Sequence, residues 1–308
     1  MNNLKVMKGH EKVIPLQGTR ISKETSKIEL LKKITKKKEF SQLPKKDIEL
    51  AFEKFDKDKY SDEEKFKLTR DLLRKVFSSF TSLKLLKNRE INPEEALKKH
   101  LSTRERFQYY DELYLRILGD LKEEKNIFDL GAGINGFSYK YFEKIDRNFH
   151  YIGIEAIGQL VELMNYHFKT RGIENCHALH MSLFEIDKIK KYIKGAELHQ
   201  GCIPKKGTRT PHEASKNLKK RFLQGAKIVF LFKTIDSLEM LERNYSKKLI
   251  SEISPLVDRI VVSFATKSMN KRKKFKVKRN WIINFIKENF EILDDFEIGD
   301  ERYIIFRK

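Results

Sequence analysis

Apolar side chains recur every three or four positions through the first third of the chain, which is the spacing of amphipathic helices. The repeat is strongest between Glu63 and Phe80, and Asp62, after Ser61, stands where an N-cap residue would precede that helix. Residues 1–22 show no such period. We therefore predict that residues 1–100 form a mostly helical N-terminal extension built from several short helices.

The pattern changes at Ser102. The run Ser102-Thr-Arg-Glu105 fits a capping box, in which the serine hydroxyl and the glutamate carboxylate satisfy backbone N–H groups at the start of a helix. The apolar repeat after it predicts one helix that runs to about Leu118, with Gly119 as its stop.

Short, continuous apolar runs alternate with helical patterns in the remainder of the chain. Such runs indicate strands of a parallel sheet that is covered on both faces. The predicted strands are 126–130, 151–154, 176–180, 228–232 and 260–264, and the predicted helices between them are 137–145, 157–169, 184–193 and 238–253.

The end of the chain has a different pattern. A helix at 281–290 precedes two strand patterns, 291–298 and 302–306, which the Gly299-Asp300 pair would join as an antiparallel hairpin. We therefore predict an α/β fold with a mostly parallel, seven-stranded, Rossmann-like sheet that ends in an antiparallel hairpin. This is the plan of a class I methyltransferase domain, expected over residues 101–308, with a basic insertion at about 195–226.

Composition limits the class of protein. Hydrophobic residues make up 40 % of the 308 positions, which is enough for a folded core. Two cysteines, Cys176 and Cys202, exclude a disulfide framework or a four-cysteine zinc site. We find no apolar run long enough to span a membrane and no secretory leader, and we expect a cytoplasmic protein. We predict no metal site, because His177 and His180 lie near no further ligand.

The net charge of +21 indicates a polyanionic partner, but charge alone cannot separate RNA, DNA and a membrane surface. Residues 1–100 hold 26 basic and 16 acidic side chains, residues 101–200 hold 14 and 15, and residues 201–308 hold 25 and 13. A neutral middle with basic flanks favours a phosphate-backbone footprint over an evenly solvated surface.

The middle third also carries a glycine-rich loop. Phe128-Asp-Leu-Gly131-Ala-Gly133-Ile-Asn-Gly136 follows a predicted strand and opens a helix, where a backbone without Cβ atoms can approach a ligand. Gly131, Gly133 and Gly136 also match the dinucleotide fingerprint. Glu155 ends the next strand, where an acid accepts ribose hydroxyls.

Three ligands for this loop are therefore open: a nicotinamide dinucleotide, S-adenosylmethionine, or none. Asp129 precedes the glycines and suits a cationic amino-acid group better than a pyrophosphate. The long segment before the fold and the terminal hairpin also favour S-adenosylmethionine.

Several segments resemble one family, the small-subunit rRNA guanine-N7 methyltransferases that confer aminoglycoside resistance. His100-Leu-Ser-Thr-Arg-Glu-Arg106 is similar to the family's His-x-Ser-Thr-x-Glu-Arg segment. The likeness continues through the glycine-rich loop and the strand that ends at Glu155. It includes Val229-Phe-Leu-Phe-Lys233 and Ser263-Phe-Ala-Thr-Lys-Ser268, and it covers roughly residues 35–308.

The resemblance implies an S-adenosylmethionine-dependent RNA methyltransferase. Arg106 would pair with the cofactor carboxylate, Asp129 would orient the methionine end and Glu155 the ribose, and Lys233 would position the target base. A surface ion pair for Arg106, a solvated strand end for Lys233 and a helix-surface histidine for His100 are the alternatives. The implied cofactor-binding residues are His100, Thr103, Arg106, Asp129, Gly131, Gly133, Glu155, Ala156, Ser182 and Leu183.

The resemblance also implies an RNA partner, gripped by the basic extension and by a basic segment near the C-terminus. The predicted RNA-binding residues are Lys267, Lys271, Arg272, Lys273, Lys274, Lys276, Lys278 and Arg279. We favour a monomer with no disulfide and no membrane partner.

The chain departs from the family pattern at Gly136 and Ala265, which replace prolines, and at the insertion. These changes leave the RNA target open between small-subunit rRNA and a tRNA. A non-catalytic role in RNA binding or ribosome assembly is the further alternative.

Overall fold

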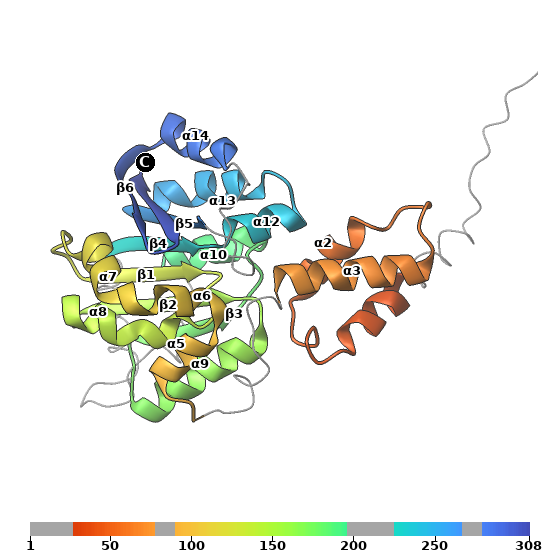
Figure 1. The fold of residues 1–308 in the computed structure, drawn as a ribbon, viewed down its shortest axis with the longest axis horizontal. Coiled ribbons are helices and arrows are strands. Elements are labelled where there is room, and N and C mark those ends of the chain that lie inside the picture. The colour runs from red at the N-terminus through yellow and green to blue at the C-terminus, as the bar shows by residue number, and fades with distance from the viewer. Residues whose placement is uncertain (1–26, 78–89, 196–224, 267–278) are drawn as a thin grey trace, which may run out of the picture.

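The computed structural model describes residues 27–77, 90–195, 225–266 and 279–308 (Figure 1). Its centre is a seven-stranded sheet in the order β3-β2-β1-β4-β5-β7-β6. The first five strands are parallel, and β7 runs antiparallel to both of its neighbours. The strands are β1 (Lys125–Leu130), β2 (Phe149–Glu155), β3 (Cys176–His180), β4 (Ala226–Phe232), β5 (Arg259–Ala265), β6 (Glu291–Ile298) and β7 (Glu301–Arg307).

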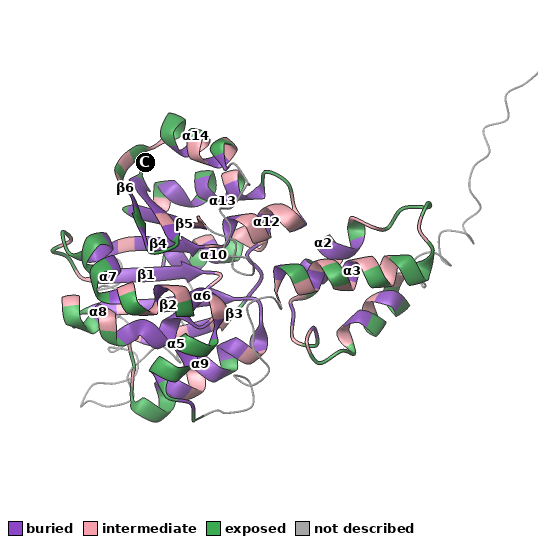
Figure 2. Cartoon of the chain, viewed as in Figure 1, coloured by how far each residue is buried: buried purple, intermediate pink, exposed green. Residues whose placement is uncertain are grey.

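Helices cover both faces of the sheet, so strands such as β1 are buried along their whole length (Figure 2). One face packs against α5 (Pro93–Lys99), α7 (Tyr110–Leu118), α8 (Tyr139–Ile145) and α9 (Gly158–Arg171). The other packs against α10 (Ile186–Ile193), α12 (Ile235–Leu241), α13 (Tyr245–Ile253) and α14 (Asn280–Asn289). The sheet and the terminal hairpin confirm the predicted class I methyltransferase fold.

A helical lobe precedes this domain. It contains a helical segment at 27–35, α2 (Lys45–Glu53) and α3 (Asp62–Val76). Its apolar side chains, among them Ile34, Phe40 and Phe52, belong to the same buried cluster as one face of the sheet. Gln42 also bonds Glu162 on α9 at 3.2 Å, and the Gln159 amide donates to the Lys38 carbonyl. The lobe therefore packs directly on the start of α9.

Two local predictions are wrong. Ser61, not Asp62, caps α3, and it forms a complete capping box with Glu64. The single helix predicted from Ser102 to Leu118 is two: α6 (Leu101–Arg106) and α7, joined by a 3-10 turn at Phe107–Tyr109. His100 precedes α6, and the Ser102 hydroxyl accepts a hydrogen bond from the Arg106 guanidinium at 2.6 Å. Ser102 thus provides an acceptor for a buried arginine and does not cap a helix.

The long helix predicted at 238–253 is also divided. Asn244 lies between α12 and α13 with a φ of 64°, a left-handed conformation that an α-helix cannot contain. The predicted basic insertion lies almost entirely outside the described residues.

Candidate active site

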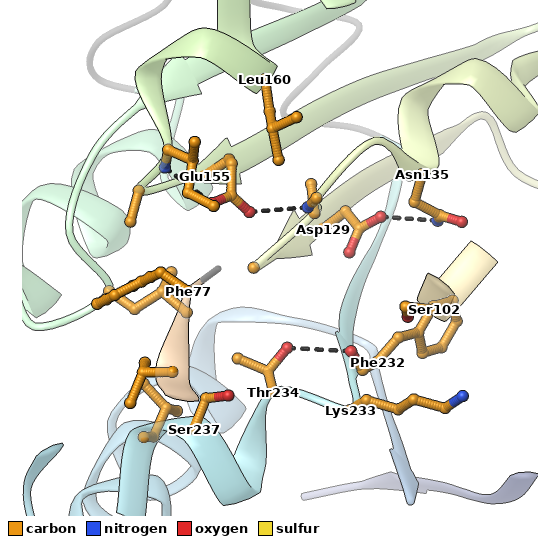
Figure 3. A pocket seen from close by; sticks show the side chains of 18 of the residues that line it. Phe77, Ser102, Asp129, Asn135, Glu155, Leu160, Phe232, Lys233, Thr234 and Ser237 are labelled. Carbon is orange, nitrogen blue, oxygen red and sulfur yellow. Dashed lines mark hydrogen bonds between the residues drawn. The ribbon is translucent and has the colours of Figure 1, made fainter. Parts of the chain in front are cut away.

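A pocket opens at the carboxyl ends of β1, β2 and β4, the place where doubly wound sheets bind ligands (Figure 3). The glycine-rich loop after β1 forms one side. The end of β4, with Phe232, Lys233 and Thr234, forms another. Of the predicted cofactor-binding residues, the structure brings His100, Arg106, Asp129, Gly131, Gly133, Glu155, Ala156 and Leu183 together around this pocket.

The glycines hold the loop in a conformation that other residues adopt poorly. Gly131 and Gly133 have φ values of 79° and 55°, in the left-handed region that favours glycine. The N–H groups of Gly131 and Ala132 both donate to the Ile154 carbonyl on β2. The loop therefore folds across the end of the neighbouring strand and presents its backbone to the pocket.

Gly136, at the end of the glycine-rich loop, packs closely against the core. A Cβ atom there would lie 2.8 Å from the Phe168 ring and 3.0 Å from the Tyr151 ring. Both rings are buried in the core. The tight packing of α9 and β2 on the loop thus requires glycine at this position.

Glu155 ties two loops together. One carboxylate oxygen accepts the Gly133 N–H and the other the Ile157 N–H, each at 2.8 Å. Burial raises the pKa of this carboxyl, and the backbone donors counteract part of the rise. Each oxygen retains a second lone pair. The geometry is thus compatible with acceptance of ribose hydroxyls.

Asp129 is buried and held from two sides. Its Oδ2 atom accepts the Asn135 amide at 2.8 Å and the Tyr151 hydroxyl at 2.9 Å. Burial raises its pKa, and these two donors and the positive charge of Arg106 work in the opposite direction. The carboxylate thus lies in a fixed orientation on the glycine-loop side of the pocket (Figure 3).

Arg106 does not form a surface ion pair; its side chain is 4 % exposed and pairs with Glu301 at 3.3 Å. The guanidinium donates to the Asn135 side chain at 3.1 Å and to Ser102 at 2.6 Å. Burial disfavours its charge, but Glu301 and three neighbouring tyrosines, Tyr110, Tyr303 and Tyr114, together more than offset this and raise its pKa. A fixed, charged guanidinium therefore lies beside Asp129 in the pocket wall.

Lys233 is also buried rather than solvated. Its ammonium pairs with Glu301 at 3.0 Å and forms a close ion pair with Glu105 of α6. The residue has a φ of 56°, held by hydrogen bonds from its N–H to the hydroxyl and the carbonyl of Ser263 on β5. The ammonium therefore lies at the junction of α6, β4 and β7 at the edge of the pocket.

His100 lines the pocket and is not a surface histidine, since it is only 3 % exposed. Burial, followed by the charges of Arg106 and Lys233, lowers its pKa to about 3. Its Nδ1 atom has no hydrogen-bond partner among the described residues. Thr103 is a correction: it does not line the pocket, because its hydroxyl donates to the carbonyls of Leu97 and His100.

The remaining predicted cofactor-binding residues, which follow β2 and β3, divide in the same way. Leu183 and Ala156 line the pocket. Ser182 is fully buried behind them and accepts the Phe184 N–H at 3.1 Å. Its hydroxyl also lowers the pKa of Asp47 in the helical lobe.

The predicted RNA-binding residues other than Arg279 all lie outside the described residues. Arg279 itself is a correction. It is 7 % exposed, pairs with Asp236 on α12 and donates to the Ala265 carbonyl. Its guanidinium fastens the start of α14 to the domain and is not presented to a nucleic acid.

The site contains three residues that sequence reasoning missed. Asn135 accepts from Arg106, Tyr110 and Tyr114 while its amide donates to Asp129. Glu301 lies between Arg106 and Lys233, and Asp47 reaches the pocket from the helical lobe. The position of Asn135 in the glycine-rich loop, two residues after Gly133, could have identified it as a site residue. Nothing in the local sequence distinguishes Glu301 or Asp47 from surface acids.

Within the described segments no cluster of three or more His, Cys, Asp and Glu side chains could hold a metal ion. None of the described helices has the length and apolar character of a membrane span.

No family profile and no curated protein matches the sequence. Solved structures do match the fold. The 16S rRNA methylase RmtB has a TM-score of 0.65 at 17 % identity, over 91 % of this chain and 98 % of that one. An rRNA methylase from Escherichia coli has a TM-score of 0.65 at 18 % identity, over 91 % of this chain and 99 % of that one. The 16S rRNA methyltransferase RmtF, in complex with S-adenosyl-L-homocysteine, has a TM-score of 0.67 at 19 % identity, over 92 % of this chain and 99 % of that one.

At identities this low, the structural similarity establishes the fold alone. The chain has the fold of a class I methyltransferase, and its likeness to these rRNA methylases extends over nearly their whole length.

Proposed function

We propose that the protein is an S-adenosylmethionine-dependent RNA methyltransferase that methylates guanine N7, with small-subunit rRNA as its substrate. One observation carries the proposal: Arg106, Asp129 and Glu155 are fixed around one pocket at the carboxyl ends of the strands. A cationic and an anionic group side by side complement the zwitterionic end of an amino acid, and a second acid beyond the loop complements a ribose. The full-length likeness to rRNA methylases supports an RNA substrate.

The residues of the pocket fit this cofactor. Cβ atoms at Gly131 and Gly133 would lie 2.8 Å from Thr234 and 3.0 Å from His100, so the bare backbone keeps the loop side of the pocket open. Arg106 would hold the carboxylate, Asp129 the amino group, Glu155 the ribose hydroxyls, and Ala156 and Leu183 the base.

Bound S-adenosylmethionine would supply an electrophilic methyl group on a sulfonium sulfur. Guanine N7 has an available lone pair and carries no proton, so the protein needs no general base at the nucleophile. Its contribution is to place the base and the cofactor in line. Lys233, at the pocket edge, is the residue that we assign to positioning the target base.

The test is methyl transfer from radiolabelled S-adenosylmethionine to small ribosomal subunits and, separately, to total tRNA. Aniline cleavage of the labelled RNA reports N7-methylguanine. We expect label and cleavage on the small-subunit rRNA, and much less of both with Asp129→Asn protein at limiting S-adenosylmethionine. Label confined to tRNA would move the substrate to tRNA. Label without cleavage would refute N7, and no label with RNA binding retained would indicate a non-catalytic RNA-binding protein.

A nicotinamide cofactor is tested on the same preparation. Titration with NADH and with S-adenosylhomocysteine should show binding of the second ligand only.

A further inference from the structure

One wall of the pocket comes from the helical lobe and not from the methyltransferase domain. Asp47 of α2, Val76 at the end of α3 and the following Phe77 all line it. Figure 3 shows Phe77 across the pocket from Asn135. The lobe therefore contributes directly to the ligand site, in addition to any surface that it offers to RNA.

Asp47 is the unusual member of this wall. It is 2 % exposed, and its Oδ2 atom has no hydrogen-bond partner among the described residues. The acids that influence it are Glu155 and Glu185, both of like charge. A buried carboxyl oxygen in such surroundings lacks the donor that buried polar groups normally have.

The position of Asp47 indicates which donor is missing. It lines the same pocket as Glu155 at the end of β2, and the groups that act on its charge are Ser182 after β3 and Glu155 itself. Asp129 and Arg106 hold the opposite, amino-acid end of the pocket. Asp47 therefore lies at the nucleoside end, where a bound adenosine offers two kinds of donor, the ribose hydroxyls and the exocyclic amine of the base. Glu155 already stands at the ribose position.

We propose that Asp47 recognises the adenine base, and that its free carboxyl oxygen accepts a hydrogen bond from the exocyclic amine. The assignment rests on the proposed function, since it takes S-adenosylmethionine as the ligand. Val76 and Phe77 add apolar surface on the same side of the pocket. The helical lobe is then part of the cofactor site, and cofactor binding favours its docked position.

Burial, moderated by the bond to Ser182, raises the pKa of Asp47 to about 7. An acceptor oxygen is present in both protonation states of a carboxyl. Recognition of an amine by this residue therefore does not require the ionised form.

The test uses calorimetric titration of the full-length protein with two probes, S-adenosylhomocysteine and its 6-desamino purine analogue, which lacks only the exocyclic amine. We expect the wild type to bind the analogue about tenfold more weakly, which is the loss of one hydrogen bond. Asp47→Ala should bind both probes with the weaker affinity. Asp47→Asn, which keeps an acceptor oxygen, should retain most of the preference. Glu49→Ala removes an acid from the same helix outside the pocket and should behave as wild type.

The outcomes distinguish failure of the role assigned to Asp47 from failure of the proposed function. If the wild type binds both probes equally, or if Asp47→Ala keeps the tenfold preference, then Asp47 does not read the amine. Equal affinities in the wild type refute the assignment even if Asp47→Ala does not fold, which circular dichroism would reveal; Asp47→Asn then provides the variant comparison. If the wild type binds neither probe, the proposed function fails instead.

Discussion

The Nζ atom of Lys233 lies 3.0 Å from the Oε2 atom of Glu301, and both side chains are almost completely buried. The Nε atom of Arg106 approaches the same oxygen at 3.3 Å. Lys233 also pairs with Glu105, which is partly exposed. One acid on the antiparallel strand β7 thus holds two cations from two other elements, α6 and β4. The terminal hairpin is therefore a structural component of the pocket.

Glu301→Gln should destabilise the protein strongly, because it leaves Arg106 and Lys233 buried with less compensating charge. Removal of one partner from a buried ionic network typically costs about 3–5 kcal/mol. Urea denaturation followed by circular dichroism measures the change in the free energy of unfolding. Glu297→Gln, on the exposed face of the same hairpin, is the matched control and should leave it unchanged. An unaltered unfolding midpoint in Glu301→Gln would show that the network does not stabilise the fold.

The sheet was predictable because buried parallel strands consist of continuous apolar runs. The bounds of β3, Cys176–His180, and of β6, Glu291–Ile298, match the prediction at both ends, and those of the other strands differ by one or two residues. The hairpin followed from Gly299-Asp300, where Gly299 has a φ of 60°. Glycine and aspartate favour such turns whatever surrounds them. Local chemistry determines these elements, so a single sequence reveals them.

The charged groups that complete the site were not predictable in the same way. Glu301 begins a strand just after a turn, and Asp47 belongs to a strongly basic lobe. Each becomes a site residue only because the fold brings it against Arg106 or Ser182. The same effect explains why Ser102 bonds Arg106 instead of capping a helix. Burial forces polar groups to find distant partners, and sequence spacing does not record them.

Lys233→Ala should lower the rate of methyl transfer without preventing cofactor binding. Its ammonium lies at the pocket edge, so its loss should disturb placement of the target base, for which a displacement of 1 Å can cost about 10²-fold. Single-turnover methylation of small ribosomal subunits measures the rate, and titration with S-adenosylhomocysteine measures affinity. Lys227→Ala, near the opposite end of β4, should change neither. A loss of cofactor affinity as large as the loss of rate would assign Lys233 to cofactor binding.

Asp129→Asn should weaken cofactor binding while RNA binding survives. The substitution keeps the shape of the side chain but removes the charge assigned to the amino group of the cofactor. A hydrogen bond to a charged group is worth about 1.5–3 kcal/mol, so we expect roughly a 10- to 150-fold higher Kd for S-adenosylhomocysteine by calorimetry. Filter binding to small-subunit rRNA should be unchanged. Asp187→Asn on the exposed face of α10 serves as control. Wild-type affinity in Asp129→Asn would remove this residue from the site.

His100 should make the protein less stable in acid. Burial and the neighbouring Arg106 and Lys233 lower its pKa to about 3 in the folded protein, against about 6.5 in the unfolded chain. Between these values the unfolded state binds more protons, so stability falls as the pH drops below about 6.5, by up to ~1.4 kcal/mol per pH unit. His100→Gln should flatten this dependence in urea denaturation between pH 7 and pH 5, with parallel curves above pH 7.5. Identical slopes in both proteins would show that His100 protonates freely in the folded state.

The basic segment near the C-terminus should set RNA affinity through phosphate contacts. Lys271, Arg272, Lys273 and Lys274 lie outside the described residues, so this prediction rests on charge alone. Each phosphate contact contributes about −0.7 to the slope of log affinity against log salt for a single strand. Conversion of all four residues to glutamine should therefore reduce the magnitude of this slope by up to ~3. Binding of S-adenosylhomocysteine should remain intact. The control replaces Lys188, Lys190, Lys191 and Lys194 on and just after α10, which removes the same net charge elsewhere. An equal loss of salt dependence in both proteins would assign the effect to overall charge and not to this segment.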